Sequence, residues 1–540
     1  MFFTDVNTKT LSKETKWEIS PKTTGEQMEN QSRRKFLKTI GTATISLSSL
    51  SQISCLGMHR DNSDGGKRPN IILINADDLG YAGIGCYGQK LIQTPNIDKM
   101  AEEGIRFTDF YAANTVCVPS RYSLITGQHP GHSGIRDNFR PHVNINLENG
   151  GGYMRDYPEG IWPPSVTTLG QVLKNAGYKT AQFGKLEAGI PMPAGKMTEH
   201  GWDYWIGFRG TGAAFQYYPL SIWKNDEKIT FEANKADDVR RHGIVGDKGV
   251  YTEDLFVEDM LRFIRKHKDD PFFIYFPTQV PHGRSPRDGD QIQVPDIGPY
   301  ADRPWTHLEK LYAAMITRFD GHVGRIIEQL KELGLDENTI IFFTSDNGDE
   351  NSYYRYTDRF HATGPLRGKK RFLYEGGIRV PMIVRWPGQI KAAQTNNLPW
   401  AAWDLMATFA DLAGVKAPEH TDGISVVPTL LGQPDQQEPR EYLYWEYQQG
   451  KQQAVRIGRW KGVRFGGTKE PIELYDLSKD IGEKNDIAAA HPDVVEKMQH
   501  IMKKAREGSE YAKYWQLPEH RRNDIKLDKR IFDQLKNGIR

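Results

Sequence analysis

The chain has 540 residues, which is enough to bury a large core and to form more than one domain. A formal net charge of +2 and a pI near 8.1 give no strongly basic field, so nucleic-acid binding is not indicated. Three cysteines, at positions 55, 86 and 117, cannot form a disulfide framework. Beyond the N-terminal region no apolar run is long enough to span a bilayer, so no transmembrane segment is expected.

The N-terminal region is typical of an export signal. Residues 32–38 (SRRKFLK) contain paired arginines and precede an apolar, Ser/Thr-rich run that ends at Leu50. This pattern indicates the twin-arginine route and a periplasmic or secreted protein, although an ordinary basic amphipathic tail is the alternative. Met28 lies just ahead of the arginines, so we expect it to be the true start and residues 1–27 an extension. Cys55 ends a weak lipobox, which leaves a membrane-anchored lipoprotein open.

Four apolar segments share one pattern, in which a short β-branched or aromatic run ends in polar or charged residues. Near-continuous apolar strands are typical of a parallel sheet that is covered on both faces. Ligands of such sheets bind at the carboxyl ends of the strands, so we expect the four endings to converge on one site. The segments are 70–75 before Asp77-Asp78, 179–183 before Gly184-Lys185, 271–277 before Pro281-His282, and 339–345 before Asp346-Asn347-Gly348.

Amphipathic helical segments lie between these strands. Apolar residues recur at helical spacing from Leu308 to Leu330, and Gly334 follows as a C-terminal cap. Shorter helices are predicted over residues 169–176 and 255–264. The alternation of strands and helices predicts an α/β fold with a large, doubly wound, mostly parallel sheet flanked by helices.

The character of the sequence changes from about Pro418. Short strands are predicted at 442–447, 453–457 and 461–465, followed by a helix from Pro492 to about Arg506. These elements predict a smaller, antiparallel α+β subdomain at the C-terminal end. The expected organisation is an N-terminal extension and signal at 1–55, a linker at 56–68, a catalytic domain at 69–417, the C-terminal subdomain at 418–515 and a charged tail at 516–540.

A cysteine motif stands at residues 116–136. Cys117, Pro119, Ser120 and Arg121 form C-x-P-S-R, and a Thr-Gly pair follows at 126–127. A lone cysteine is usually a buried structural residue. Together with the segments 79–88 and 376–381, however, this motif resembles that of the type I, formylglycine-dependent sulfatases, which are arylsulfatase-like enzymes of the alkaline phosphatase-like superfamily. The resemblance extends from about Arg68 to Tyr475.

The resemblance implies a specific use for Cys117. A maturation enzyme would oxidise it to formylglycine (3-oxoalanine), an aldehyde that hydrates to a geminal diol. One hydroxyl attacks sulfur to give a sulfate-ester intermediate, and loss of the proton from the other expels sulfate. A serine could perform the first step but would be left with a stable ester.

Acidic residues at two strand ends predict a metal site. Asp77 and Asp78 follow one strand, and Asp346 and Asn347 follow another. Ligation by oxygen favours Ca²⁺ or Mg²⁺ over zinc. The resemblance implies one Ca²⁺, held by these four residues and by residue 117. The alternative is that such acidic pairs are solvated loop charges.

The resemblance also gives roles to basic residues. It implies that Arg121 holds the hydrated form of residue 117, that Lys185 binds sulfate or the leaving oxygen, and that Lys370 binds sulfate. His282 matches the histidine that contacts sulfate and protonates the leaving alcohol. A lone lysine is otherwise usually a solvated surface charge, and His282 could be a hydrogen-bonded structural histidine.

One position departs from the family pattern. The family commonly has G-K-W-H-L-G, where the histidine acts as a base, but here Glu187 stands in its place. Glu187 could serve as that base or contact the substrate, although it would repel sulfate unless Lys185 neutralised it. His129 and His132, just past the cysteine motif, are other candidate bases.

These observations predict an exported sulfatase that hydrolyses sulfate esters to an alcohol and inorganic sulfate. Export and the 12 Trp and 24 Tyr favour a sulfated glycan over a simple aryl sulfate as substrate. Two alternatives stay open. One is a phosphodiester or phosphonate monoester hydrolase of the same superfamily, and the other is a non-catalytic protein that binds sulfated glycans.

Overall fold

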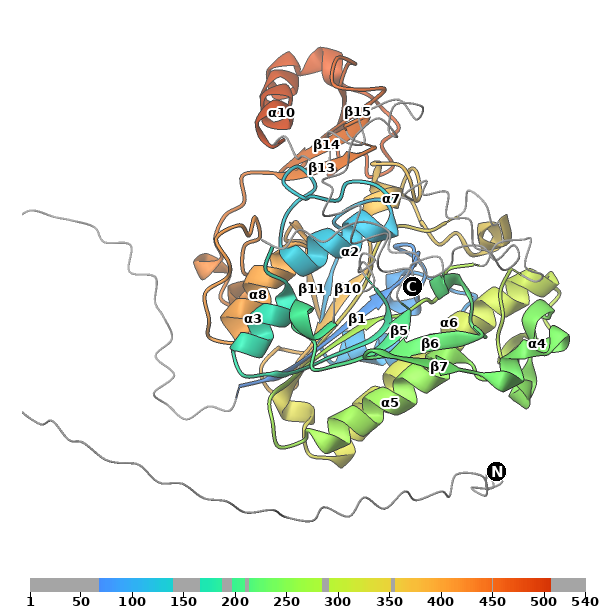
Figure 1. The fold of residues 1–540 in the computed structure, drawn as a ribbon. Coiled ribbons are helices and arrows are strands. Elements are labelled where there is room, and N and C mark those ends of the chain that lie inside the picture. The colour runs from blue at the N-terminus through green and yellow to red at the C-terminus, as the bar shows by residue number, and fades with distance from the viewer. Residues whose placement is uncertain are drawn as a thin grey trace, which may run out of the picture. The chain divides into compact units, whose positions relative to one another are not determined.

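A computed structural model describes residues 68–138, 166–186, 197–208, 213–283, 291–350, 355–448 and 450–506 (Figure 1). The predicted export signal, Cys55, Glu187 and the predicted tail from 516 lie outside the described residues. Among the helices that are described, none has both the length and the apolar character needed to cross a membrane.

The main sheet has ten strands in the order β11-β2-β10-β9-β1-β8-β4-β5-β6-β7. Its centre consists of the four strands that the sequence predicts, and neighbouring members of this group run parallel. Their carboxyl ends therefore lie side by side at one edge, as expected. These strands are β1 (Asn70–Ala76), β4 (Lys179–Lys185), β8 (Phe272–Pro277) and β9 (Thr339–Ser345).

Shorter strands extend the sheet on both sides of this centre, and β6, β7 and β10 pair in antiparallel fashion. The flanking strands are β2 (Ile105–Phe107), β5 (Tyr204–Phe208), β6 (Ser221–Lys224), β7 (Glu227–Thr230), β10 (Met382–Arg385) and β11 (Gln394–Asn396). A separate parallel pair is formed by β3 (Phe110–Tyr111) and β12 (Trp400–Ala401).

Helices cover both faces of the main sheet (Figure 1). In β1, Ile71 and Leu73 pack into one hydrophobic core, whereas Ile72 and Ile74 pack into the other. The first core contains residues of α2 (Cys117–Thr126), α3 (Leu169–Asn175) and α8 (Asp404–Leu412), and the second contains residues of α1 (Pro95–Glu102), α5 (Thr252–Lys266) and α6 (His307–Glu332). The doubly wound α/β fold is therefore confirmed. The remaining helices of this part are α4 (Asp237–Arg241), α7 (Glu375–Ile378) and α9 (Val427–Leu430).

A second, four-stranded antiparallel sheet follows, as predicted. Its strands are β13 (Leu443–Tyr447), β14 (Gln452–Ile457), β15 (Trp460–Phe465) and β16 (Glu473–Asp476), and α10 (Pro492–Lys504) follows them. Alternate residues divide its faces, because Trp445 and Ala454 join the core of the main sheet whereas Tyr444 and Val455 pack with α10. The sheet is thus buried on both sides, and β16 is a strand that the sequence analysis did not predict.

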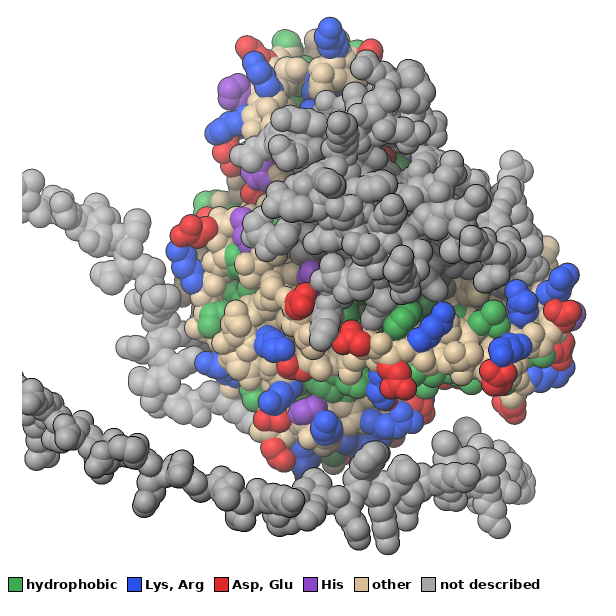
Figure 2. Space-filling view, viewed as in Figure 1, with side chains coloured by type: hydrophobic (Ala, Val, Ile, Leu, Met, Phe, Trp, Pro, Cys, Tyr) green, Lys and Arg blue, Asp and Glu red, His purple; other side chains and the backbone are tan. Residues whose placement is uncertain are grey.

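Charged residues of both signs are mixed over the described surface in Figure 2. This distribution agrees with a net charge of only +2.

Candidate active site

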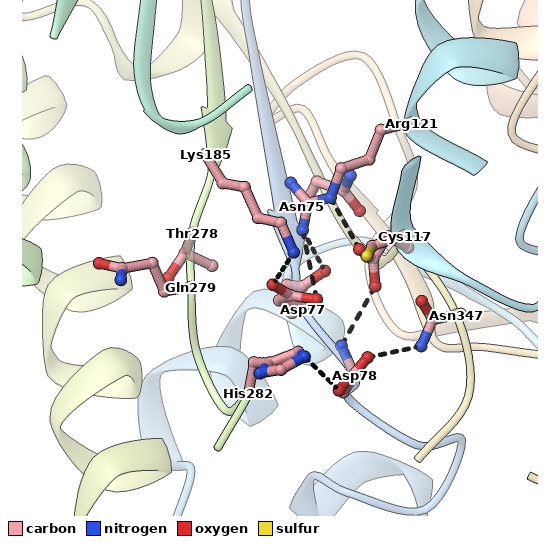
Figure 3. A network of polar contacts seen from close by, with 12 residues as sticks. Asn75, Asp77, Asp78, Cys117, Arg121, Lys185, Thr278, Gln279, His282 and Asn347 are labelled. Carbon is pink, nitrogen blue, oxygen red and sulfur yellow. Dashed lines mark hydrogen bonds and ion pairs between the residues drawn. The ribbon is translucent and has the colours of Figure 1, made fainter. Parts of the chain in front are cut away.

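The ends of β1 and β9 bring the predicted acidic residues together (Figure 3). The backbone N–H of Asp78 donates to Asp346 Oδ1 over 3.1 Å, and Asn347 Nδ2 donates to Asp78 Oδ1 over 2.7 Å. Asp78 has a φ of 68°, a left-handed conformation that is uncommon for a residue other than glycine. Such backbone strain is often found at functional sites.

Lys185, the last residue of β4, points its side chain into this cluster, and its Nζ lies 2.6 Å from Asp77 Oδ2. The preceding Gly184 has a φ of 116°, and a Cβ atom there would lie 2.3 Å from the carbonyl oxygen of Pro277 on β8. Only glycine fits this position. Gly184 therefore lets the backbone of β4 pass close to that of β8, and this path directs the Lys185 side chain into the site.

Cys117 is the first residue of α2 and Arg121 lies one turn later. Arg121 Nε donates to Asp346 Oδ2 over 2.7 Å, and Arg121 Nη2 lies 3.9 Å from Asp77 Oδ1. The Cys117 sulfur and carboxylate oxygens of Asp77 and Asp346 all lie within 4.8 Å of one another. Acidic groups that follow β1 and β9, two strands far apart in the sequence, thus meet beside the cysteine.

Lys370 and His282 approach the other acidic residue, Asp78. Lys370 Nζ lies 2.6 and 2.9 Å from the two Asp78 carboxylate oxygens, and His282 Nε2 lies 3.4 Å from Asp78 Oδ2. The ring of His282 stacks on Phe215 with centroids 4.2 Å apart, and its Nδ1 lies 2.6 Å from the carbonyl oxygen of Gly283. Because a carbonyl only accepts, Nδ1 carries the proton and Nε2 faces the site.

Asn138 is a neighbour of Cys117 that the sequence analysis missed. Its Nδ2 donates to the Cys117 sulfur over 3.5 Å, and its Oδ1 accepts from the Val118 backbone N–H over 3.1 Å. The side chain therefore links residue 117 to one of the unpaired N–H groups at the start of α2. No local pattern marks this asparagine, because its role depends on a fold that brings the two segments together.

Burial and neighbouring charges shift the pKa values in opposite directions across the site. For Asp77, burial alone would raise the pKa, but Lys185 and His282 outweigh it and hold the pKa well below its usual range. Burial raises the pKa of Asp346 to about 7, although Arg121 opposes the shift, and nearby Asp77 adds to it. Burial also raises the pKa of the Cys117 thiol. Of the two carboxylates beside residue 117, Asp346 is therefore the one that is short of positive charge.

Two buried oxygen atoms indicate what could supply that charge. Asp77 Oδ1 and Asn347 Oδ1 have no hydrogen-bond partner in the part of the chain that the structure describes. Buried acceptors are normally paired, and carboxylate and amide oxygens are the ligands that Ca²⁺ and Mg²⁺ prefer. The residues present therefore fit a hard divalent cation.

The structure places the other candidate bases elsewhere. His132 Nδ1 lies 2.7 Å from Asp422 Oδ1, and His129 stacks on His132 with ring centroids 4.2 Å apart. These three residues form a cluster of their own. Glu187 lies outside the described residues, so its proposed role stays a prediction.

The sequence profile of the family described as "Sulfatase" matches residues 69–415, well over half of the chain. The chain belongs to the sulfatase family. The profile "N-sulphoglucosamine sulphohydrolase, C-terminal" matches residues 368–508, which include the four-stranded sheet. As a sulfatase, the protein is a hydrolase of sulfate esters, and members of the family generally use formylglycine and a metal ion.

Similar proteins cover most of this sulfatase. Human arylsulfatase A is 30% identical over 80% of this chain and 87% of its own length. An N-acetylgalactosamine-6-O-sulfatase of Bacteroides thetaiotaomicron is 28% identical over 82% of this chain and 94% of its own. The crystal structure of Ps i-CgsB in complex with k-i-k-neocarrahexaose has a TM-score of 0.68 and 27% identity, and covers 85% of this chain and 99% of its own.

Proposed function

We propose that this sulfatase removes sulfate from a sugar hydroxyl of a sulfated glycan, with Cys117 converted to formylglycine. The observation that carries the proposal is the meeting of Cys117, Asp77 and Asp346 within 4.8 Å, next to buried basic side chains. The names of similar proteins support the carbohydrate substrate, since one is an N-acetylgalactosamine-6-O-sulfatase and another was crystallised with a neocarrahexaose.

The modified residue would supply a hydroxyl that attacks sulfur and a second hydroxyl whose deprotonation allows sulfate to leave. The residues around it orient that group. Arg121 is itself held by Asp346, and Asn138 contacts the Cys117 sulfur. The contact with Asn138 limits the rotation of residue 117 and favours attack in one direction.

The proposed metal is Ca²⁺, held by Asp77, Asp78, Asp346 and Asn347 together with residue 117. A bound calcium would lower the pKa of the attacking hydroxyl and offset charge on the sulfuryl group. Lys185 Nζ and Lys370 Nζ each lie 2.6 Å from a carboxylate oxygen, of Asp77 and Asp78 respectively. A cation on these carboxylates would leave both ammonium groups for the sulfate oxygens.

We assign to His282 the transfer of a proton to the leaving group. Its Nδ1–H donates to the carbonyl of Gly283. Proton exchange with the substrate therefore takes place at Nε2, which faces Asp78. Burial lowers the pKa of His282, while Asp78 opposes the shift. Stacking on Phe215 keeps the ring in one plane, so Nε2 stays directed toward the site.

The test is desulfation of a panel of sulfated mono- and oligosaccharides by enzyme whose Cys117 peptide has the mass of formylglycine. The expected result is release of sulfate from at least one glycan, with a lower kcat/KM on a matched aryl phosphate diester or phosphonate monoester. Higher activity on the phosphorus esters would favour the alternative hydrolase. Sulfate release only from aryl esters would overturn the glycan assignment.

We further propose export by the twin-arginine route to the periplasm or medium, supported by the residues at 32–50. The double variant Arg33→Lys, Arg34→Lys is expected to stay in the cytoplasm, as measured by cell fractionation. Replacement of Cys55 by serine tests the lipid anchor, because it would release a lipoprotein from the membrane fraction and leave a freely exported protein unchanged.

A further inference from the structure

The C-terminal sheet contacts two of the chain segments that carry the site, one before Cys117 and one after Lys370. Asn114, three residues before Cys117, donates from Nδ2 to the carbonyl of Glu446 on β13 over 3.0 Å. Trp445 of the same strand donates from its indole to the carbonyl of Ala112 over 3.0 Å. The segment that leads into α2, the helix that begins at Cys117, is therefore hydrogen-bonded to β13.

A second contact joins the C-terminal sheet to the loop that contains Lys370, the lysine proposed to bind sulfate. Gln452, the first residue of β14, donates from Nε2 to the carbonyl of Arg371 over 2.9 Å and accepts at Oε1 from the N–H of Leu373 over 3.2 Å. One side-chain amide thus pairs with the backbone as a neighbouring strand would. The Gln452 side chain is buried, so water cannot readily replace these two hydrogen bonds.

The backbone next to Lys370 needs such support. Arg371 has a φ of 77°, which is unfavourable for a residue with a side chain. A strained residue persists only when its surroundings hold it in place. Here the Arg371 N–H donates to the carbonyl of Thr115 over 3.1 Å, and Thr115 Oγ1 donates to the carbonyl of Phe372 over 2.9 Å. Gln452 holds the opposite edge of the same turn.

We propose that Gln452 is a positioning residue for catalysis, which acts by holding the strained Arg371 turn so that Lys370 reaches the sulfate. The inference rests on the proposed function, because it takes Lys370 as the sulfate-binding lysine. It gives the C-terminal sheet a part in the reaction although that sheet supplies no group that touches the sulfate. Loss of the clamp lets the turn relax, and a misplacement of about 1 Å can cost on the order of a hundredfold in rate.

The test is a double-mutant cycle between Gln452→Ala and Lys370→Ala in formylglycine-converted enzyme. Gln452→Ala is expected to lower kcat/KM for an aryl sulfate by about tenfold to a hundredfold and to weaken inhibition by inorganic sulfate. In the Lys370→Ala background the same change is expected to lower kcat/KM by less than about threefold, because residues that act through one another are not additive. Equal factors in both backgrounds would overturn the proposal.

Gln453→Ala is the matched control. Gln453 is the next residue of β14 and is also buried, but its side chain bonds to Tyr444, Arg464 and the carbonyl of Met502 inside the C-terminal part. It is expected to lower the melting temperature while changing sulfate inhibition by less than about twofold. A similar loss of sulfate inhibition in both variants would show a general effect of the C-terminal sheet and would contradict a specific clamp.

Gln452→Glu keeps the test decisive if the alanine variant does not fold. The glutamate retains an acceptor for the Leu373 N–H but loses the donor to the Arg371 carbonyl. Its kcat/KM is therefore expected to fall between those of the wild type and Gln452→Ala. Wild-type activity in the glutamate variant would overturn the proposal. Inactivity of the converted wild-type enzyme on every sulfate ester would instead count against the proposed function.

Discussion

At the scale of single residues, Lys370 and Asp78 form a buried ion pair. Each has a different proposed ligand, which is sulfate for Lys370 and the cation for Asp78. Lys370 Nζ lies within 2.9 Å of both Asp78 oxygens, and this pairing raises the pKa of the lysine even though burial alone would lower it. The lysine is therefore always charged and its position is fixed by the carboxylate. A cation at Asp78 and a sulfate beside Lys370 would replace one buried pair by two.

Lys370→Ala is expected to lower kcat/KM on sulfate esters by about a hundredfold to a thousandfold, since it removes a fixed charge from the site of developing negative charge. Steady-state kinetics of converted enzyme measure the effect. Lys369→Ala is the control, because this neighbouring lysine contributes only its carbonyl, as acceptor for the N–H of Phe372, among the contacts described. A loss below about fivefold for Lys370→Ala would argue against sulfate contact.

Calcium is expected to stabilise the folded protein as well as to activate it. Asp77 Oδ1 and Asn347 Oδ1 lack a hydrogen-bond donor among the described residues, and the pKa of Asp346 is raised; a cation would answer both. A ligand at a hundredfold excess over its Kd adds about 2.7 kcal/mol, so thermal unfolding after chelation and after addition of CaCl₂ should differ by several degrees. Asp346→Asn is expected to reduce that difference. An unchanged melting temperature in wild type would contradict a calcium site here.

At the scale of elements, the sequence predicted the four strands that carry the site and missed most of the others. β1, β8 and β9 are buried along their whole length and appear in the sequence as continuous apolar runs. β7 is a mostly exposed four-residue strand, EKIT, and its pairing with β6 has no such signal. The same limit explains Asn138 and Gln452, whose contacts lie far away along the chain and follow no local pattern.

The contact between α5 and the residues that follow β8 contains a buried acid that the sequence does not mark. Glu253 accepts from Thr278 Oγ1 over 2.5 Å and from the Gln279 N–H over 3.0 Å, just beyond the end of β8. Burial raises the pKa of Glu253 to about 7, although both hydrogen bonds oppose the shift. The folded protein therefore holds a proton there that the unfolded chain releases near pH 4.3.

This difference predicts how stability changes with pH. The contribution of Glu253 is complete below about pH 4.3 and is lost as the pH rises through about 7, because ionisation then occurs in a buried place. Between pH 5 and pH 8.5 the free energy of unfolding of Glu253→Gln is expected to rise by about 3 kcal/mol relative to that of the wild type, as measured by chemical unfolding. Glu258→Gln, which removes a half-buried carboxylate on the same helix that pairs with Arg325, is the control for the loss of one charge. A difference between Glu253→Gln and wild type that does not vary with pH would refute the assignment.

At the scale of the whole molecule, a buried ion network joins the C-terminal sheet to the segment after Lys370. Lys461 on β15 lies 2.7 Å from Glu375 and 3.0 Å from Glu483, and Glu375 also pairs with Arg379 over 2.9 Å. Burial raises the pKa of Glu483 to about 7, although Lys461 opposes the shift, and nearby Glu375 adds to it. The lysine is therefore shared by two carboxylates.

Lys461→Met is expected to destabilise the protein by about 3–5 kcal/mol at pH 8, because it leaves two buried carboxylates with one fewer cation. The loss should be smaller at pH 5.5, where Glu483 is protonated in the folded state. Adding Glu483→Gln should recover most of the stability at pH 8, since Glu375 keeps Arg379 as its partner. Chemical unfolding of the single and double variants measures both effects, with exposed Lys469→Met as the control. If the double variant is no more stable than Lys461→Met, the defect comes from lost packing and not from unbalanced charge.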